Sequence, residues 1–483
     1  MPARASVRGT VLTSCVAACL MALPVYTATA STTYTTVNST WNGGTDNWTT
    51  AAAWSNTPTI SEYPNNGTPS ATAYDVLVTN GGVSGAYTLT LSSNISVDSL
   101  TVDNPNATLD QTGGTLDLAQ FGGTAVGTLD VNIGQYILGG TLSNANLTTD
   151  GSFGTFRIAS NGAATLQNVT LGSDLTLGTV NTGDYLDITN TSANATGLDF
   201  SGHALNVLGK TVLVDFTNPT NVAQSINGNI NLEGNGDEIS AYPGGLTVSS
   251  TATITASAAG SFDVVTAATG SGVQITNAGT IQATNGTALG INPPFINNTN
   301  LILATGGSTV DIYPTTLTNS GTIAAGHDSF VNIGSNAGST WQQNGTLQAS
   351  AGGEIAVTPN DAGGTGTMEM TSGSAYDVQL GSSGQAGLLS VEGNLQLDSG
   401  SMLSVSQLVG SILSGPYDIL NYTGTLSGTF TTVTPGYVLD YASHPGEILV
   451  TAVPEPAALA VFALGLAGLG LSRRKSSKRK VAA

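Results

Sequence analysis

The stretch TNAGTIQAT, Thr276–Thr284, returns three times farther along the chain in altered form. Its later copies are NNTNLILAT at Asn297–Thr305, LTNSGTIAAG at Leu317–Gly326 and QQNGTLQAS at Gln342–Ser350. When these copies are aligned on the first apolar residue after the Asn-rich turn, that residue recurs at intervals of 21, 21 and 24, as Ile281, Ile302, Ile323 and Leu347. A fixed period of this length indicates a repeat protein whose units cannot bury their apolar faces alone.

Four further columns of apolar residues keep the same spacing. They are Ala283, Ala304, Ala325 and Ala349; Leu289, Val310, Val331 and Ile355; Ile291, Ile312, Ile333 and Val357; and Ile275, Ile296, Leu317 and Trp341. We expect the next unit, 21 residues on, to continue four of the five columns with Met368, Met370, Tyr376 and Val378. Side chains of a strand alternate between its faces, so residues two apart point the same way. The pattern predicts an all-β fold, a parallel β-helix solenoid in which each column stacks inside the rod.

Weaker repeats extend the solenoid toward the N-terminus. TLSNANL at Thr141–Leu147 returns as TLQNVTL at Thr165–Leu171, and TGGTLDL at Thr112–Leu118 is related to both. Coils of this length over residues 90–400 predict roughly 14 turns and a rod of about 65 Å at the strand spacing of ~4.8 Å. We expect corners at Pro293, Pro314 and Pro359 and at the Asn, Ser and Gly residues before each GTI, which tolerate left-handed backbone angles.

The two ends of the solenoid need caps. STWNGGTDNWTTAAAWSNTP carries Trp41, Trp48 and Trp54, which predict an N-terminal cap or, alternatively, a platform on which sugars stack. The residues from Gly415 to Val453 predict a small antiparallel β cap with Gly and Pro turns. The predicted boundaries are 1–30 for a signal peptide, 31–90 for the N-terminal β cap, 91–405 for the β-helix, 406–452 for the C-terminal β cap and 453–480 for a terminal sorting segment.

The first 30 residues have the order of a secretory signal peptide. Arg4 and Arg8 precede an apolar run, and a cleavage site follows at Ala28 and Ala30. The alternatives are an uncleaved anchor, or a lipoprotein whose lipidated residue is Cys19 in VAAC. Both cysteines of the chain lie in this segment, so the exported protein is expected to have no disulfide and no thiolate metal site.

Charge excludes some partners and favours others. Between residues 31 and 453 the chain has 29 acidic side chains against two basic ones, Arg157 and Lys210. Nucleic acid is therefore excluded as a partner, because phosphate binding needs clustered Lys and Arg. Divalent cations or neutral glycans fit this balance better, although an acidic surface also serves solubility alone.

The sequence predicts no catalytic residue, cofactor or metal site. Polysaccharide lyases need a cationic residue that only Arg157 or Lys210 could supply, whereas a hydrolytic carboxylate pair is set by a distance of ~5–9 Å that no sequence reveals. His203, His327 and His444 lack metal-ligand spacing. EGNGDE at Glu233–Glu238 resembles a calcium-binding nonapeptide, but it stands alone where such sites form rows.

The C-terminal end has three parts in a fixed order. Val453, Pro454, Glu455 and Pro456 come first, an uncharged run from Ala457 to Leu471 follows, and a basic cluster closes the chain at Arg473, Arg474, Lys475, Lys478, Arg479 and Lys480. The run is expected to form a short apolar helix, and the cluster would hold its end on the cytoplasmic side. The three parts together resemble the PEP-CTERM sorting signal of Gram-negative bacteria.

This resemblance implies that an exosortase recognises and processes the chain at Pro454, Glu455 and Pro456, after transient anchoring in the inner membrane. Proteins with this signal are usually associated with exopolysaccharide and biofilm. The WNGG and GTL/GTI patterns are also similar to autotransporter passengers, but the sorting tail stands where a translocating barrel would be expected.

We therefore expect a secreted, non-enzymatic surface or matrix protein whose partners are an exosortase and exopolysaccharide, and which meets the membrane only through its C-terminal segment. The alternatives are a polysaccharide-degrading enzyme on the same scaffold and a permanently anchored surface protein.

Overall fold

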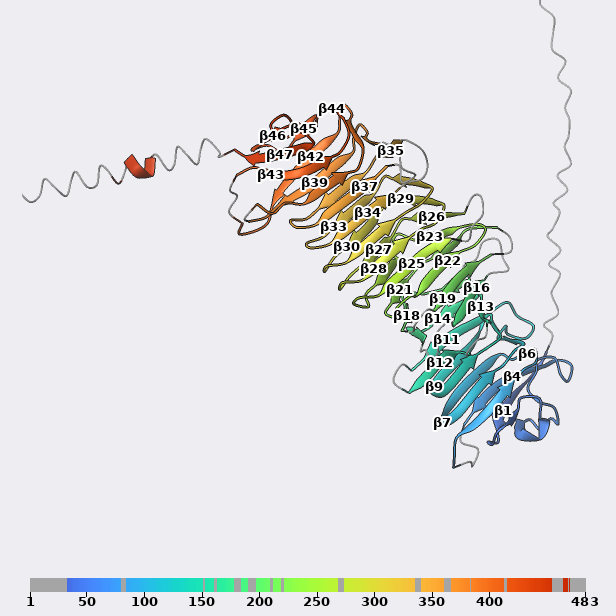
Figure 1. The fold of residues 1–483 in the computed structure, drawn as a ribbon. Helices are drawn as coiled ribbons and strands as arrows, with labels where there is room; N and C mark the ends of the chain where they lie inside the picture. Colours follow the sequence, from blue (N-terminus) through green and yellow to red (C-terminus); the bar gives the residue numbers. More distant parts are fainter. Residues whose placement is uncertain are drawn as a thin grey trace, which may run out of the picture.

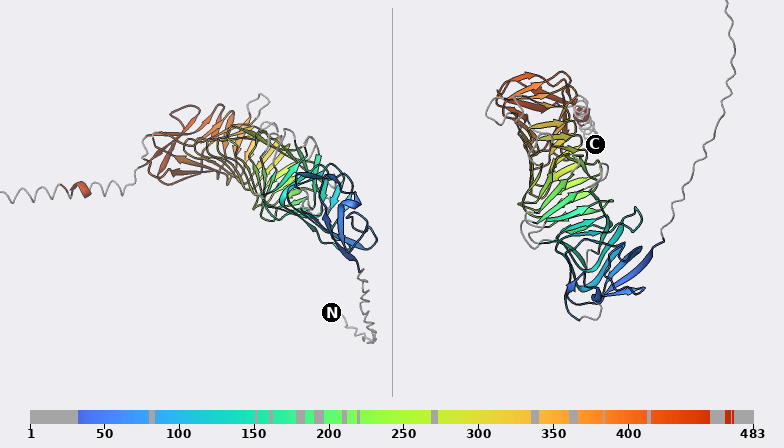
Figure 2. Two further views of the ribbon diagram at one scale, coloured as in Figure 1. Left: turned by 90° about the horizontal axis from the view of Figure 1, so that it is seen from below. Right: turned by 90° about the vertical axis from the view of Figure 1, so that its right-hand side faces the viewer.

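The computed structural model describes residues 33–79, 84–150, 153–159, 163–177, 184–189, 197–208, 212–218, 221–267, 273–334, 340–359, 366–382, 384–411, 415–453, 464–467 and 469. The regular secondary structure of this part of the chain is almost wholly β-strand, and the strands wind into a β-solenoid (Figure 1). The all-β parallel β-helix is thus confirmed. The solenoid curves along its length, and its two caps lie at opposite ends (Figure 2).

The solenoid has about 12 turns, fewer than the 14 expected. Between residues 180 and 270 the register of the repeats cannot be read from the sequence. The coils there are longer than the 21-residue coils that follow, because Leu205, Ile230, Ile254 and Ile281 occupy consecutive coils at intervals of 25, 24 and 27 residues. A given length of chain therefore makes fewer turns than a 21-residue period predicts.

Four sheets make up the walls. Sheet 1, at the N-terminal end, contains β1 (Thr35–Trp41), β2 (Asp46–Asn47), β3 (Trp54–Thr57), β4 (Thr72–Val78), β5 (Tyr87–Leu91), β7 (Ser99–Gln111), β9 (Gly127–Leu138), β11 (Ala145–Thr149), β12 (Gly154–Ile158), β14 (Val169–Leu171) and β17 (Leu198–Asp199). A 3-10 helix, η1 (Ala51–Ala53), lies between β2 and β3.

Sheet 2 runs along the whole solenoid. It contains β6 (Ile95–Ser96), β8 (Thr115–Asp117), β10 (Thr141–Ser143), β13 (Ala163–Gln167), β16 (Tyr185–Thr189), β19 (Leu213–Thr217), β22 (Glu238–Ala241), β25 (Phe262–Ala267), β28 (Ala288–Ile291), β31 (Thr309–Ile312), β34 (Phe330–Gly334), β37 (Glu354–Thr358), β40 (Leu388–Val391), β43 (Tyr417–Tyr422), β46 (Tyr437–Asp440) and β47 (Glu447–Ala452).

The other two walls begin farther along the chain. Sheet 3 contains β15 (Leu175–Leu177), β18 (Ala204–Val207), β21 (Asn229–Leu232), β24 (Thr253–Ala256), β27 (Thr280–Ala283), β30 (Leu301–Ala304), β33 (Thr322–Ala325), β36 (Thr346–Ala349), β39 (Ala375–Leu380), β42 (Met402–Gln407) and β45 (Thr432–Val433). Sheet 4 contains β20 (Gln224–Ile226), β23 (Leu246–Val248), β26 (Gln274–Asn277), β29 (Phe295–Asn298), β32 (Thr316–Asn319), β35 (Thr340–Gln343), β38 (Thr367–Met370), β41 (Asn394–Leu397) and β44 (Leu426–Gly428).

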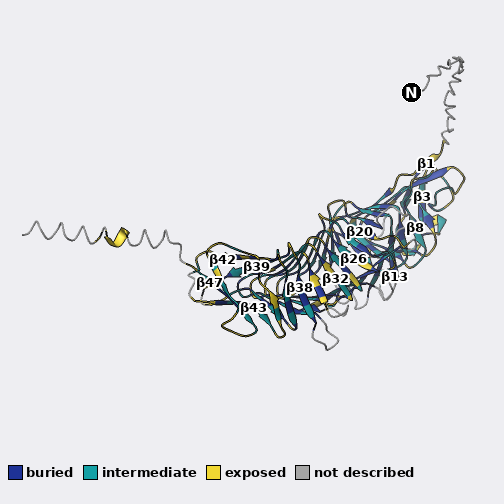
Figure 3. Ribbon diagram, turned by 90° about the horizontal axis from the view of Figure 1, so that it is seen from above, coloured by how far each residue is buried: buried dark blue, intermediate teal, exposed yellow. Residues whose placement is uncertain are grey.

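The predicted columns stack as expected. From β20 on, each coil passes through sheets 4, 3 and 2 in turn. Parallel pairing places Ile281 beside Ile302, Ile302 beside Ile323 and Ile323 beside Leu347. These side chains are at most 1% exposed, and buried residues follow the strands along the whole rod (Figure 3). Each such side chain contributes about 1.5–3 kcal/mol to stability through burial.

All four column assignments predicted for the unit after Leu347 are wrong. Tyr376 and Val378 stack on Leu347 and Ala349, whereas the Ile355 and Val357 columns continue with Leu389 and Val391. Met368 and Met370 do not continue the Leu347 and Ala349 columns; they lie in β38 of sheet 4, paired with Trp341 and Gln343. Tyr376 is the residue that stacks on Leu347, at an interval of 29 residues. Because this coil is longer, the residues 21 positions after Leu347 and Ala349 lie in sheet 4 instead of sheet 3.

The predicted corner before each GTI or GTL is confirmed, since these residues join sheet 4 to sheet 3, but its backbone is not left-handed. Gly279, Gly321 and Gly345 do not have positive φ angles, and their small size is needed for another reason. A Cβ on Gly321 would lie 2.2 Å from the carbonyl oxygen of Asn300 in the preceding coil. Glycine therefore permits close stacking of coils at this corner.

The Asn residues at this corner point into the core, where they form a ladder. The Nδ2 of Asn277 donates to Oδ1 of Asn298 (2.8 Å), that of Asn298 to Asn319 (2.7 Å), and that of Asn319 to Oε1 of Gln343 (3.0 Å). All four side chains are completely buried. At the corner between sheets 2 and 1 in the earlier repeats, Asn144 and Asn168 do adopt positive φ angles, of 53° and 55°, and Asn285 does so between sheets 3 and 2 in a later coil, at 61°.

Both ends of the rod are closed. At the C-terminal end β47 pairs antiparallel with β43 and β46, as the sequence predicts. At the N-terminal end β1 pairs parallel with β4 and antiparallel with β3, so parallel stacking extends to residues before 91. Trp41, Trp48 and Trp54 pack in one buried cluster with ring centroids 4.9 Å apart. Their rings are covered, which contradicts the alternative of a sugar-stacking platform.

Candidate functional site

Sheet 4 opens between β32 and β35. Here the ladder has a single registered pair, Asn319 with Gln343, whereas β29 with β32 and β35 with β38 each have four. A cavity of about 340 Å³ occupies the opening. Its lining residues are Thr316, Leu317, Thr318, Thr340, Trp341, Gln342 and Asn344. We call this cavity the slot.

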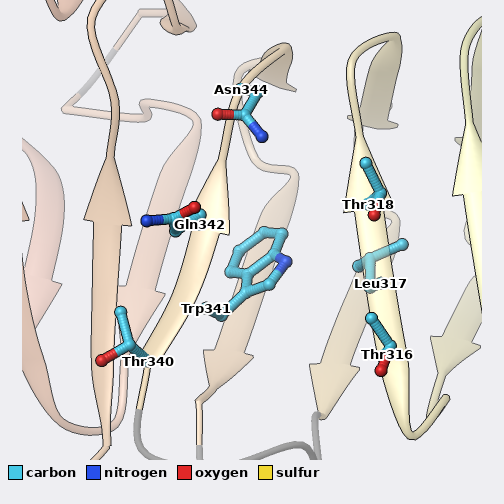
Figure 4. Close-up of a pocket in the computed structure, with 7 residues that line it drawn as sticks. All are labelled: Thr316, Leu317, Thr318, Thr340, Trp341, Gln342 and Asn344. Atoms are coloured by element: carbon cyan, nitrogen blue, oxygen red, sulfur yellow. The ribbon is translucent and has the colours of Figure 1, made fainter.

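Trp341 is the largest side chain of the slot. It takes a column position that Ile275, Ile296 and Leu317 hold in the preceding coils, and its indole ring lies between β35 and β32 (Figure 4). The side chain is only 4% exposed, and within the described structure its Nε1–H has no hydrogen-bond acceptor. The sequence pattern placed Trp341 in its column, but it gave no sign of the opening.

Apart from Leu317, the rest of the lining is polar and uncharged. The amide of Gln342 donates from Nε2 to Oε2 of Glu369 in the next coil (2.9 Å), and Oδ1 of Asn344 accepts from Oγ1 of Thr371 (2.8 Å). These bonds hold two amide side chains at the rim. The slot therefore offers hydroxyl and amide groups in fixed positions beside an aromatic surface.

A second cluster lies on the outer side of sheet 2. Asp187 of β16, Asp215 of β19 and Glu238 of β22 are on consecutive coils, with Tyr185 and Tyr242 beside them. Asp215 points outward by strand parity yet is completely buried, and neither of its carboxylate oxygens has a hydrogen bond of good geometry. Burial raises the pKa of all three carboxyl groups, and the charge of Asp215 raises the pKa of the other two further.

The EGNGDE loop uses its buried carboxylate to hold the backbone. The oxygens of Asp237 accept bonds from the amides of Val212 and Gly234, both at 3.1 Å, while Asp263 accepts from the amides of Gly236 and Asp237. Burial, with a smaller contribution from the nearby Asp263 charge, raises the pKa of Asp237 to about 6. Among the described residues no group of three or more His, Cys, Asp or Glu side chains is arranged to hold a metal ion.

The structure reaches few of the predicted terminal residues. Val453 is described and 46% exposed, just after β47. Ala28, Ala30, Pro454, Glu455, Pro456, the basic cluster from Arg473 to Lys480, Cys15, Cys19 and Lys210 lie outside the described residues. Arg157, the other candidate cation, is in β12 opposite Ile137 of β9. Leu464, Gly465, Leu466, Ala467 and Leu469 are helical, and no helix within the described ranges is long and apolar enough to span a bilayer.

Comparison with known proteins identifies the terminal segment. The family model of the PEP-CTERM protein-sorting motif matches residues 452–475. This motif indicates a secreted surface protein that is transiently anchored in a membrane and processed by an exosortase. No curated protein matches the chain significantly.

Proposed function

We propose that this chain is a non-catalytic adhesive rod of the exopolysaccharide matrix, displayed on the outer surface of a Gram-negative bacterium after exosortase processing. The sorting motif supports delivery to the surface, and the solenoid supports a structural role there. The surface itself supports adhesion to glycans.

The observation that carries the adhesive role is the row of outward polar residues on sheet 4. Thr276, Asn297 and Thr318 lie side by side on consecutive coils, and Gln342 follows in β35. Neighbouring paired strands repeat every ~4.8 Å, so Thr276, Asn297 and Thr318 offer regularly spaced hydroxyl and amide groups. The opening of sheet 4 separates Gln342 from them. Many weak contacts to one polymer add up to firm binding even where each is weak.

Retention by matrix polysaccharide tests this function. The secreted chain is incubated with purified exopolysaccharide of the producing strain and sedimented at low and high salt. Because the contacts are uncharged, we expect retention that is unchanged by salt. Loss of retention at high salt, or no retention at either concentration, would overturn the proposal.

A second candidate function, polysaccharide hydrolysis, has one supporting observation, the cluster of Asp187, Asp215 and Glu238. Hydrolysis needs two carboxyl groups that flank the bond within a substrate cleft. Asp215 is completely buried, and the slot lies on a different wall with a lining that contains no carboxylate. Release of reducing ends from the exopolysaccharide, abolished by Asp187→Asn, would favour the enzyme over the adhesive rod.

A further inference from the structure

The opening of sheet 4 is confined to one wall. The same two coils remain fully paired elsewhere, with four registered pairs between β33 and β36 and five between β34 and β37. The coils therefore part as a wedge, held at the usual spacing of ~4.8 Å on the other walls. An inserted peptide strand would need about twice that spacing across the gap, so the slot suits a small ligand and not a strand.

The slot contains a buried donor that the described residues leave unused. The other three tryptophans donate their indole N–H groups to carbonyl oxygens: Trp41 to Gly44 (3.3 Å), Trp48 to Pro64 (2.8 Å) and Trp54 to Trp48 (2.7 Å). The Nε1–H of Trp341 is equally buried and has no acceptor within the described structure. Leaving such a donor unpaired costs about 1–3 kcal/mol, which an oxygen atom from outside the chain would recover.

The lining defines the chemistry of that oxygen. It combines an indole and Leu317 with threonine hydroxyls and two amides, and it contains no ionisable side chain. A ligand with both an apolar face and hydroxyl groups matches this combination. The net charge of −20 disfavours an anionic ligand, and the lining has no cation to bind one.

We propose that the slot is a recognition site for one neutral sugar unit, held by the Trp341 indole and by the rim amide of Gln342. The inference rests on the proposed adhesive function and adds to it a defined site. The volume of about 340 Å³ falls at the lower end of the ~300–1,000 Å³ typical of small-molecule sites, which agrees with a single sugar unit.

Indole nitrogen NMR of the full secreted chain tests the site directly. The chain has four tryptophans, and the signal missing from Trp341→Phe identifies that of Trp341. The probes are cellotetraose and mannotetraose as neutral saccharides and tetragalacturonate as a charged one. We expect a neutral saccharide to shift the Trp341 signal saturably, with a Kd in the millimolar range or tighter, while the other three signals stay in place.

Matched variants separate recognition from structure. Trp341→Phe keeps a ring but removes the donor, and Gln342→Ala removes the rim amide; each is expected to weaken binding about threefold to tenfold, the effect of one neutral hydrogen bond. Gln348→Ala, exposed on sheet 3 of the same coil and outside the row, is expected to leave the Kd unchanged. Trp341→Leu restores the aliphatic column, so it should fold and bind no saccharide.

Three results would overturn the site. The first is no shift of the Trp341 signal by either neutral saccharide, which would leave ordered water as the occupant. The others are equal shifts of all four tryptophan signals, and equal saccharide binding by wild type and Trp341→Leu. Retention of each variant by the exopolysaccharide is measured in parallel. Equal retention of wild type and Trp341→Leu would refute the slot but leave adhesion standing, whereas no retention of the wild type would refute both.

Discussion

Replacing Asn298 by Ala removes the centre of the buried ladder. The Asn298 amide donates to Oδ1 of Asn319 (2.7 Å) and to the carbonyl oxygen of Thr322 (3.2 Å), and its Oδ1 accepts from Asn277 (2.8 Å). After the change Asn277 keeps its bond to the carbonyl oxygen of Leu301 (2.9 Å), whereas Oδ1 of Asn319 is left buried without a donor.

The cost follows from these contacts. An unsatisfied buried acceptor costs about 1–3 kcal/mol, and each of the other lost hydrogen bonds about 1 kcal/mol. Together they predict a decrease of about 3–5 kcal/mol in the free energy of unfolding. Asn297→Ala, next to it in β29 but pointing outward, is expected to change this free energy by no more than about 0.5 kcal/mol.

Urea denaturation of the two variants, followed by circular dichroism, measures the difference. Because repeat proteins unfold in parts, amide hydrogen exchange in β26, β29 and β32 is recorded as well, and Asn298→Ala should accelerate exchange most in these strands. A double-mutant cycle with Asn319→Ala should give a coupling of about 1–2 kcal/mol. Equal urea midpoints for Asn298→Ala and Asn297→Ala would refute the ladder as a source of stability.

Three other predictions follow from particular contacts. Gly321→Ala places a Cβ 2.2 Å from the Asn300 carbonyl oxygen and should lower the free energy of unfolding by about 1–3 kcal/mol. Gly85→Ala, with open space around it, should lower it much less. Thermal denaturation compares the two variants, and equal melting temperatures would contradict the close-stacking role of Gly321. The raised pKa of Asp237 means that folding favours its protonated form, so the free energy of unfolding should decrease as pH rises from 3.8 to about 6. Asp237→Asn should flatten that decrease in urea titrations, and an unchanged slope would contradict it. In a background with Cys15 and Cys19 replaced by Ser, cysteines at positions 282 and 303, which face each other on adjacent coils, should form a disulfide. Cysteines at positions 282 and 348, which are several coils apart, should not. Gel mobility with and without reductant shows whether each disulfide forms.

The fold was predictable because a stacked fold requires the same type of residue at the same position of every coil. A column such as Ile281, Ile302 and Ile323 is visible in the sequence because each coil must place an apolar residue at the same inward position. The same reasoning failed at Met368 and Met370, because a longer coil places them in sheet 4 instead of sheet 3. It also failed over residues 180–270, because coil lengths vary there. Insertions at corners leave no trace in a strand pattern.

The candidate site was less predictable than the fold. Trp341 was placed in its column, but whether an indole fits between coils or parts them depends on packing that spacing does not encode. The buried ladder was missed for a related reason. Asn277, Asn298 and Asn319 belong to a residue type that is common in turns. Only their complete burial and their hydrogen bonds in the structure show that their side chains point inward and bond one another. Asp215 likewise looks solvent-exposed by strand parity, and its burial becomes visible only with the neighbouring tyrosines in place.

The central claim is that a stacked rod is delivered to the cell surface by its terminal sorting motif. Mass spectrometry of the terminal peptides of the protein recovered from the surface tests this claim most directly. We expect the chain to end at or near Pro454–Pro456, with no peptide from the basic cluster between Arg473 and Lys480. Recovery of that cluster on the surface-exposed protein would contradict sorting and would indicate a permanent anchor instead.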